Sequence, residues 1–199
     1  VPVQWEIAED AQFTKHVQKG ETFALPELGH SVHVEVQGLK PAREYFYRFI
    51  IPNGDASPVA RTKTAPAYNS RPERLRVALA GCQHFEAGFF TAYEHLSKED
   101  LDCVYMYGDY IYEGAGGAGG GSESGGKRQR VRDHVGGEIY SLDDYRRRYA
   151  QYHLDANLQA AHHSAPFICA FDDHEVDNDW ATLHEERGSP AQLFDMRRA

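Results

Sequence analysis

The sequence predicts a multidomain α+β chain, in which a small β-sandwich is followed by an α/β region. Two observations predict this division. Short β-type segments punctuated by turn residues fill residues 1–68, and apolar strand-like runs alternate with helical patterns over residues 69–199. Residues 62–67 read as the linker between the two parts. A length of 199 residues allows one large domain or two small ones.

The first region contains two clear strand signals. Residues 32–36 alternate apolar and polar side chains, and residues 45–51 are aromatic and β-branched. Turn signals at Gly38, at Lys40-Pro41 and at residues 52–55 separate them. Short strands at this spacing predict a sandwich. The run from residue 34 to residue 47 also resembles the strand–turn–tyrosine pattern of fibronectin type III and immunoglobulin-like modules.

Three apolar runs predict the strands of the second region. Residues 75–80 read as a buried strand that ends at Gly81, residues 101–107 as a strand that ends at Gly108, and residues 166–171 as a third. Helical patterns separate these runs, so we expect a parallel sheet whose ligands bind at the carboxyl ends of the strands.

Helix signals fill the intervals between these strands. Phe90, Tyr93 and Leu96 recur at helical spacing. Ser141 and Asp144 form a predicted capping box, and Asp155 is expected to cap a further helix that runs through residue 165. We expect arginines 146–148 and the pair His162-His163 to be solvated residues of helix faces.

Composition excludes several classes of function. Thirty acidic against 21 basic residues give a net charge of −9, which argues against specific nucleic-acid binding. No apolar run approaches the roughly 20 residues that span a bilayer. The three cysteines are too few for a disulfide framework or a zinc ribbon, and we expect Cys103 and Cys169 to be small buried hydrophobes.

A glycine-rich stretch follows the second predicted strand. Gly114, Gly116 and Gly119 match the dinucleotide-binding pattern G-x-G-x-x-G. The glycines and serines of residues 120–126 cannot open the helix that this pattern requires, so we expect a flexible insertion loop.

Residues suited to metal binding follow each predicted strand. Cys82 follows the first, Asp109, Tyr112 and Glu113 follow the second, and five carboxylates within residues 172–179 follow the third. Such carboxylates repel one another unless a cation neutralises them, although a solvated acidic loop is the alternative. Oxygen ligands suit Ca²⁺, Mg²⁺ or Mn²⁺, whereas a thiolate and a phenolate suit a trivalent or redox-active ion.

A calcium-binding EF-hand loop can be tested from Asp173. It would need glycine at its sixth position and glutamate at its twelfth, where the sequence has Asn178 and His184. The sequence therefore argues against an EF-hand.

Four ordered segments carry a family resemblance. They are A-G-C-Q at residues 80–83, G-D-Y-I-Y-E at residues 108–113, L-D-D-Y-R-x-R-Y at residues 142–149 and F-D-D-H-E-V-x-N at residues 171–178. Together they resemble the PhoD-like family of alkaline phosphatases and phosphodiesterases, in the metallophosphoesterase superfamily. The resemblance implies an immunoglobulin-like module at residues 1–68 and the first part of the catalytic domain at residues 69–199.

The resemblance also implies roles for individual residues. Cys82, Asp109 and Tyr112 match ligands of an Fe³⁺ centre, and Asp109 would bridge to Ca²⁺, with other divalent metals as alternatives. The segment that corresponds to the Asn-His-Glu segment of the superfamily contains Asp173, His174 and Asn178. A further motif of the family, which carries a histidine and an aspartate, is absent from this sequence. We therefore expect the chain to be the N-terminal portion of the family's catalytic protein. A second polypeptide is one source of the remaining portion. The implied location is secreted or periplasmic, with the signal peptide already removed.

The predicted activity is hydrolysis of phosphate monoesters, diesters or both by a metal-activated water. His174 is expected to donate a proton to the leaving alkoxide or a hydrogen bond to the phosphate, with a structural role as the alternative. Other hypotheses are a non-catalytic acidic Ca²⁺-binding recognition module, an inert fragment and, more distantly, a cysteine hydrolase that uses Cys82.

Overall fold

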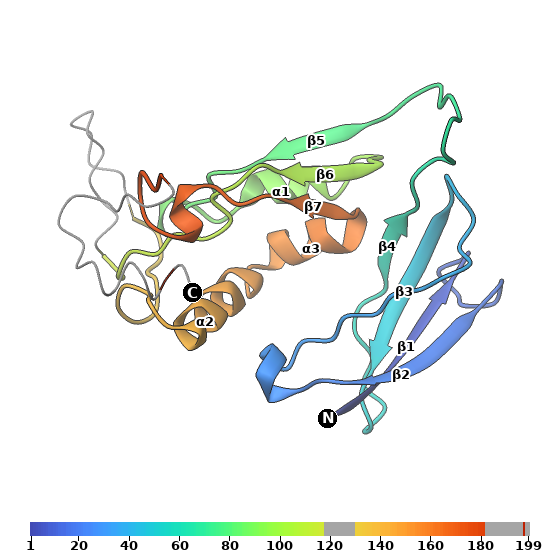
Figure 1. Cartoon of the computed structure of the whole chain (residues 1–199), viewed down its shortest axis with the longest axis horizontal. Coiled ribbons are helices and arrows are strands. Elements are labelled where there is room, and N and C mark those ends of the chain that lie inside the picture. The colour runs from blue at the N-terminus through green and yellow to red at the C-terminus, as the bar shows by residue number, and fades with distance from the viewer. Residues whose placement is uncertain (118–129, 182–196, 198–199) are drawn as a thin grey trace. The chain divides into compact units, whose positions relative to one another are not determined.

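The computed structural model describes residues 1–117, 130–181 and 197 (Figure 1). These residues form two compact units. The first contains residues 1–77, 100–103 and 162–166, and the second contains residues 78–99, 104–161 and the described residues from 167 onward. Arg61 explains part of this grouping, because its Nη1 donates to the carbonyl oxygens of Leu101 at 3.1 Å and Ser164 at 2.8 Å. The domain boundary at residue 68 stays a prediction.

The first unit is built on a four-stranded antiparallel sheet with the strand order β2-β1-β3-β4 (Figure 1). Its strands are β1 Pro2–Ala8, β2 Gln18–Phe23, β3 Glu44–Ile50 and β4 Ala60–Lys63, and a 3-10 helix, η1, spans Pro26–Leu28. The strand predicted at residues 45–51 is confirmed as β3. The linker predicted at residues 62–67 is wrong at its start, because residues 62 and 63 pair in the ladder with β3.

The strand predicted at residues 32–36 does not form. Burial does alternate there: Val32, Val34 and Val36 are half-buried, while His33 and Glu35 are exposed. The alternation therefore reports the direction of the side chains correctly, but the segment has no partner strand with which to form a ladder. Residues 1–76 are described without a gap and contain a single sheet. The predicted β-region is therefore confirmed, but the second layer of a sandwich is not seen in these residues.

A tyrosine fixes the turn before β3. Tyr45 is 3% exposed, and its hydroxyl accepts the backbone N–H of Lys40 at 2.8 Å. This contact is similar to the tyrosine corner of immunoglobulin-like domains, in which a tyrosine hydroxyl hydrogen-bonds to the backbone a few residues upstream. This contact gives the strand–turn–tyrosine pattern of the sequence a physical basis.

The second unit is organised around a three-stranded sheet with the order β5-β6-β7 (Figure 1). The strands are β5 Val77–Ala80, β6 Cys103–Met106 and β7 Phe167–Cys169, which confirms the three predicted strands with shorter bounds. Strands β6 and β7 are parallel, with Tyr105 opposite Ile168. The helices are α1 Thr91–Leu96, α2 Leu142–His153 and α3 Ala156–Ser164, with 3-10 turns η2 Phe85–Ala87 and η3 Asp173–Glu175.

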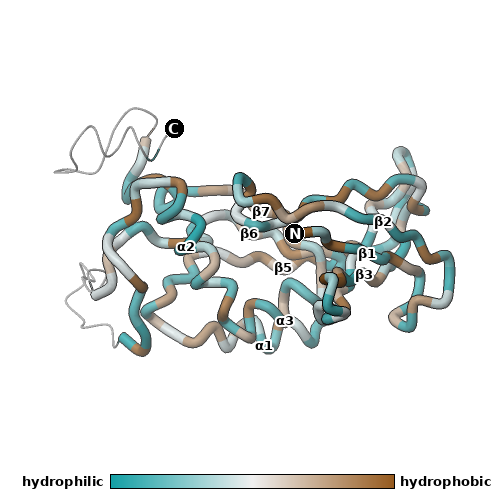
Figure 2. Tube along the Cα trace, turned by 90° about the horizontal axis from the view of Figure 1, so that it is seen from below, coloured by the Kyte–Doolittle hydropathy of each residue, from teal (hydrophilic) through white to brown (hydrophobic). Residues whose placement is uncertain are grey.

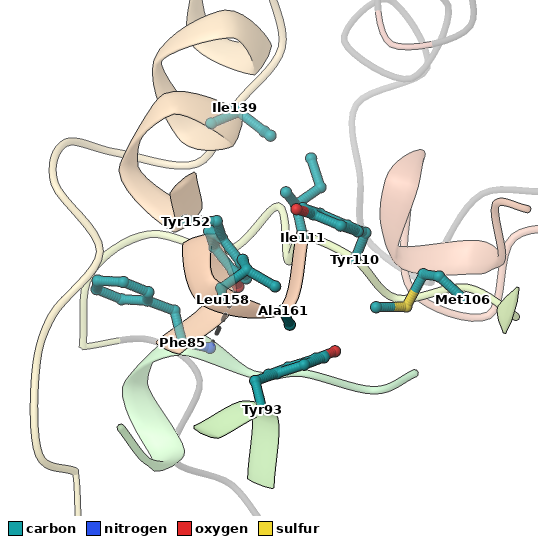
Figure 3. Close-up of a cluster of buried hydrophobic side chains, with 9 residues drawn as sticks. All are labelled: Phe85, Tyr93, Met106, Tyr110, Ile111, Ile139, Tyr152, Leu158 and Ala161. Atoms are coloured by element: carbon teal, nitrogen blue, oxygen red, sulfur yellow. Dashed lines mark hydrogen bonds between the residues drawn. The ribbon is translucent and has the colours of Figure 1, made fainter. Parts of the chain in front are cut away.

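Side chains from β6, from all three helices and from the loops between them form one apolar core. Its buried members are Phe85, Tyr93, Met106, Tyr110, Ile111, Ile139, Tyr152, Leu158 and Ala161 (Figure 3). The backbone N–H of Phe85 donates to the hydroxyl of Tyr152 at 3.2 Å, which satisfies the polar end of that tyrosine inside the core (Figure 3).

The other face of the sheet is open. Leu79 is 72% exposed, and Tyr105 and Ile168 are also exposed. The prediction that residues 75–80 form a buried strand is therefore wrong for one face of β5. Cys169 is exposed and Cys103 is half-buried, so the expected burial of Cys169 is wrong as well. Strand β7 lies at an edge of the sheet, which leaves Cys169 uncovered.

Both predicted helix caps are confirmed. Ser141 and Asp144 form the capping box of α2. Oδ1 of Asp155 accepts the N–H groups of Asn157 at 2.9 Å and Leu158 at 3.1 Å, at the start of α3. These side-chain oxygens satisfy N–H groups that have no partner within the helix.

Two predictions about helix faces need correction. Helix α2 is hydrophilic along most of its length (Figure 2), yet Arg148 is only 1% exposed, so the expected solvation is wrong for this arginine. His162 and His163 are half-buried rather than solvated. Gly119, His184 and the predicted insertion loop at residues 120–126 lie outside the described residues. No described helix is long and apolar enough to cross a bilayer.

Candidate metal centre

The loops that follow the three strands lie side by side. The N–H of Cys82, after β5, donates to the carbonyl oxygen of Gly108 at 3.2 Å, and the N–H of Gln83 donates to that of Asp109 at 3.2 Å. Gly108 has a φ of +142°, and a Cβ added to it would lie 2.4 Å from the Cβ of Asp172 in the loop after β7. A glycine at this position is therefore required for the close approach of the two loops.

Three predicted site residues converge at this edge of the sheet. Asp109, Asp173 and His174 each offer one ligand atom, and the three atoms lie within 4.8 Å of one another. Asp109 is 6% exposed, and its Oδ1 has no hydrogen-bond partner among the described residues. A buried carboxylate oxygen without a partner is costly, and a cation would satisfy it. Burial raises the pKa of the Asp109 carboxyl.

Tyr112 and Cys82 adjoin the same aspartate. The hydroxyl of Tyr112 donates to Oδ2 of Asp109 at 3.0 Å, and the thiol of Cys82 lies close enough to the Asp109 carboxylate for the two groups to influence each other's pKa. Burial, reinforced by the charge of Asp109, raises the pKa of both groups. Both therefore stay protonated at neutral pH in the absence of a cation, and ligation of a metal through them would require release of their protons.

A buried glutamate orients His174. Oε2 of Glu113 lies 2.8 Å from Nδ1 of His174, and Oε1 of Glu113 accepts the backbone N–H of Asn178 at 2.8 Å. Burial alone would lower the pKa of His174, but the hydrogen bond and charge of Glu113, with the charges of Asp109 and Asp173, raise it to about 9. Because Glu113 engages Nδ1, the second ring nitrogen, Nε2, is the one available to a ligand.

Asn178 joins this group through its backbone. Its side-chain Nδ2 donates to Oδ2 of Asp179 at 3.3 Å, so the geometry does not assign its amide to the three-residue cluster. The structure thus brings together Asp109, Asp173 and His174, with Cys82 and Tyr112 attached through Asp109.

Two of the five carboxylates in residues 172–179 face the protein interior. Glu175 accepts backbone N–H groups from both strand-end loops. Asp177 is fully buried and pairs with Arg197, which also binds Glu138 and the carbonyl oxygen of Ile139. Neither role is predicted in the sequence analysis above. The D-x-x-E spacing of Asp172 and Glu175 is a capping-box signal that could have identified Glu175, whereas no local signal identifies Arg197.

Arg148 supports the loop that carries Tyr112. Its Nη1 donates to the carbonyl oxygens of Tyr112 and, at 3.0 Å, of Gly114, and its Nη2 donates to that of Gly137 at 3.1 Å. The guanidinium therefore acts as a buried hydrogen-bond donor to backbone, a role that its place in a charged run did not suggest.

Comparisons with known proteins identify the family to which the whole of this chain is similar. The profile of the family described as PhoD-like phosphatase matches residues 77–199, and that of its N-terminal domain matches residues 1–66. Alkaline phosphatase D of Bacillus subtilis (strain 168) is 47% identical over 199 residues, which cover 100% of this chain and 33% of that protein. A solved structure titled "Structure of PhoD" matches with a TM-score of 0.92 at 47% identity, covering 100% of this chain and 37% of the solved chain. The chain thus spans about a third of the length of these relatives.

Proposed function

The chain belongs to the PhoD-like phosphatase family, and from that membership we propose that it is the N-terminal part of a metal-dependent hydrolase of phosphate monoesters, diesters or both. The observation that carries this proposal is the cluster of Asp109, Asp173 and His174, in which a buried oxygen of Asp109 has no hydrogen-bond partner within the described part of the chain. Mono- and diester substrates both fit, because selection between them depends on the shape of the pocket around the phosphate.

The donor set fits the metals that the family resemblance implies. We propose that Cys82, Asp109 and Tyr112 hold Fe³⁺, and that Asp109, Asp173 and Asn178 hold Ca²⁺ or another hard divalent ion. Two carboxylates and an amide suit a hard ion, while a thiolate and a phenolate suit Fe³⁺. When bound, these cations supply Lewis-acid activation of water and positive charge for the phosphate oxygens.

His174 supplies the protein's own proton chemistry in this proposal. Glu113 fixes the ring through Nδ1, and one ring nitrogen of His174 lies within 4.8 Å of a carboxylate oxygen of each of the two aspartates. From that position His174 donates a hydrogen bond to a phosphate oxygen or a proton to the leaving alkoxide. Arg148 keeps the backbone around Tyr112 in place, so that the phenol stays against Asp109.

Two further predictions remain proposals. An immunoglobulin-like sandwich for the N-terminal region is supported by the tyrosine corner of Tyr45 and by the match of residues 1–66 to the family's N-terminal domain. A secreted or periplasmic location rests on the resemblance alone.

The activity can be tested in a chimaera in which residues 1–199 replace the matching third of the Bacillus enzyme. We expect the metal-replete chimaera to release nitrophenol from p-nitrophenyl phosphate, from bis-p-nitrophenyl phosphate or from both. Asp109→Asn should abolish release. Tyr112→Phe should weaken it and remove the visible charge-transfer band of an Fe³⁺-phenolate, whereas Tyr68→Phe, at a tyrosine that is 95% exposed, should change neither.

The alternative is a non-catalytic acidic module that binds Ca²⁺. A folded chimaera that binds Ca²⁺ but hydrolyses neither ester, and whose metal content is unchanged by Cys82→Ala and Tyr112→Phe, would overturn the hydrolase and favour this module.

A further inference from the structure

We propose that Glu175 is a positioning residue that sets the separation between Asp109 and the pair Asp173 and His174, by locking the loops after β6 and β7 together. The proposal rests on the metal site proposed above. It goes beyond that site because Glu175 is not one of the proposed metal ligands. Its carboxylate acts on the candidate ligands only through the backbone that carries them.

The carboxylate of Glu175 accepts four backbone N–H groups. Oε1 accepts those of Tyr110 at 2.5 Å and Ile111 at 3.3 Å, and Oε2 accepts those of Asp109 at 3.1 Å and Asp172 at 2.7 Å. Three of these donors belong to the loop after β6 and one belongs to the loop after β7. One side chain thus spans both halves of the cluster.

The loop after β6 is shaped to receive an anion. Asp109 has a φ of +52°, in the left-handed region, and the N–H groups of Asp109, Tyr110 and Ile111 converge on one carboxylate. Successive N–H groups around a left-handed residue form a concave anion-binding nest. Here the chain fills the nest with its own glutamate, so these donors are not available to a phosphate.

A second carboxylate makes the reciprocal connection. Glu113, in the loop after β6, reaches His174 and Asn178 in the segment after β7, while Glu175 reaches back to the loop that carries Asp109. Asp109 and Asp173 are 64 positions apart in the sequence, so their proximity depends on such connections. Glu113 contacts a cluster residue directly, whereas Glu175 contacts only backbone.

Glutamine at position 175 is the informative substitution. It preserves size but replaces one acceptor oxygen with an NH₂ group, which would face N–H donors. The hydrogen bonds accepted by one of the two carboxylate oxygens are then lost, and at least one backbone N–H is left without its acceptor. The two loops should separate or fluctuate, and the ligand atoms of the cluster should lose their fixed spacing.

The experiment uses the 199-residue chain and two readouts that do not involve hydrolysis. Mn²⁺ affinity is measured by electron paramagnetic resonance of the free ion, and amide hydrogen exchange is followed at residues 109–111 and 172 without metal. We expect Glu175→Gln to weaken Mn²⁺ binding tenfold or more, in the range seen when groups that orient metal ligands are removed, and to speed exchange at those amides. Glu175→Asp keeps the negative charge on a shorter side chain. Compared with Glu175→Gln, it should bind Mn²⁺ more tightly and exchange those amides more slowly.

Glu86→Gln is the matched control. Glu86 is also buried and accepts two backbone N–H groups, from Gly117 at 2.9 Å and His134 at 3.0 Å, but it contacts none of the cluster residues through these bonds. We expect Glu86→Gln to lower stability without a tenfold loss of Mn²⁺ affinity. This comparison separates positioning from general destabilisation.

The outcomes that contradict the proposal are distinct. If folded Glu175→Gln binds Mn²⁺ as the wild type does, or if Glu86→Gln weakens binding equally, Glu175 is not a positioning residue, while the metal site stands. If the wild-type chain takes up no Mn²⁺, both the proposed metal site and this role for Glu175 are overturned.

Discussion

The two units of this chain place their charges differently. In the first unit, ion pairs reach the surface through their cations: Lys19 is 67% exposed where it meets Glu6, a largely buried carboxylate that also pairs with Arg48 at 2.6 Å. The second unit also has exposed ion pairs, such as Lys98 with Glu94, but it places other charges in its interior. Arg197 and Asp177 have side chains that are 0% and 1% exposed, and Arg148 donates only to carbonyl groups in the contacts described above.

This difference separates stability from function. Surface ion pairs add little stability and tolerate change, whereas a buried charge is costly unless its partners stay in place. The second unit concentrates such charges around the ends of β6 and β7, where they hold the loops of the candidate metal centre. Its architecture is therefore sensitive to substitutions that the first unit would absorb.

The strongest test of this contrast is Arg197→Met. The substitution removes Arg197 from its ion pair with the fully buried Asp177, and breaking a buried ion pair in this way costs about 3–5 kcal/mol. We expect the midpoint of urea unfolding, followed by circular dichroism, to fall accordingly. The double variant Arg197→Met/Asp177→Asn should recover part of the loss, and a cost below about 1 kcal/mol for the single variant would remove the distinction between the units.

Acid should act on the second unit through His134. Burial lowers the pKa of this histidine to about 4, and its Nε2 lies 3.0 Å from the hydroxyl of Tyr152. The neutral form is favoured in the folded state, so its contribution to stability is present above pH 6.5 and is lost as the pH falls toward 4. The shift from 6.5 to 4 corresponds to about 3 kcal/mol.

The measurement is the free energy of unfolding between pH 7 and pH 4 for the wild type and His134→Gln. The variant should lose less stability than the wild type over this interval, because it no longer takes up that proton on unfolding. Parallel curves would show that His134 does not carry the effect.

A smaller effect is expected at the tyrosine corner of the first unit. Tyr45→Phe removes the hydroxyl that accepts the N–H of Lys40 and leaves the ring in place, which should cost about 1 kcal/mol. Thermal unfolding of the 199-residue chain, with Tyr68→Phe as the exposed control, measures this loss. An unchanged melting temperature would mean that the turn is fixed by other contacts.

The smallest effect should come from Lys19→Ala. Arg48 remains paired with Glu6, and the lysine is mostly solvated, so we expect a change below about 1 kcal/mol that shrinks further at high salt. A loss comparable to that of Arg197→Met would contradict the view that the charges of the first unit contribute little.

Local patterns in the sequence were sufficient to predict most elements of the second unit. The apolar runs before Gly81 and Gly108 became β5 and β6, and Ser141 and Asp155 cap helices as their positions indicate. The segment at residues 32–36 failed for a physical reason, because alternation sets the direction of side chains but cannot supply a partner strand.

The candidate site was predictable where it depends on strand ends. Parallel strands place their carboxyl ends at one edge of a sheet, which is why Asp109, Asp173 and His174 meet. The supporting contacts were not predictable from local patterns. Arg197 reaches Asp177 across 20 positions, and Arg148 is buried because three carbonyl groups surround its guanidinium.

The contact between Gly108 and Asp172 limits how this sequence can drift in evolution. A side chain at position 108 would collide with the Cβ of Asp172, and only glycine at position 172, which has no Cβ, would relieve that collision. It would not relieve the second one, because the backbone nitrogen of residue 172 lies 2.9 Å from the same point. No change at position 172 can therefore compensate for a substitution of Gly108. Because of this contact, position 108 cannot accept a neutral substitution, whereas the contact does not by itself exclude substitutions at position 172.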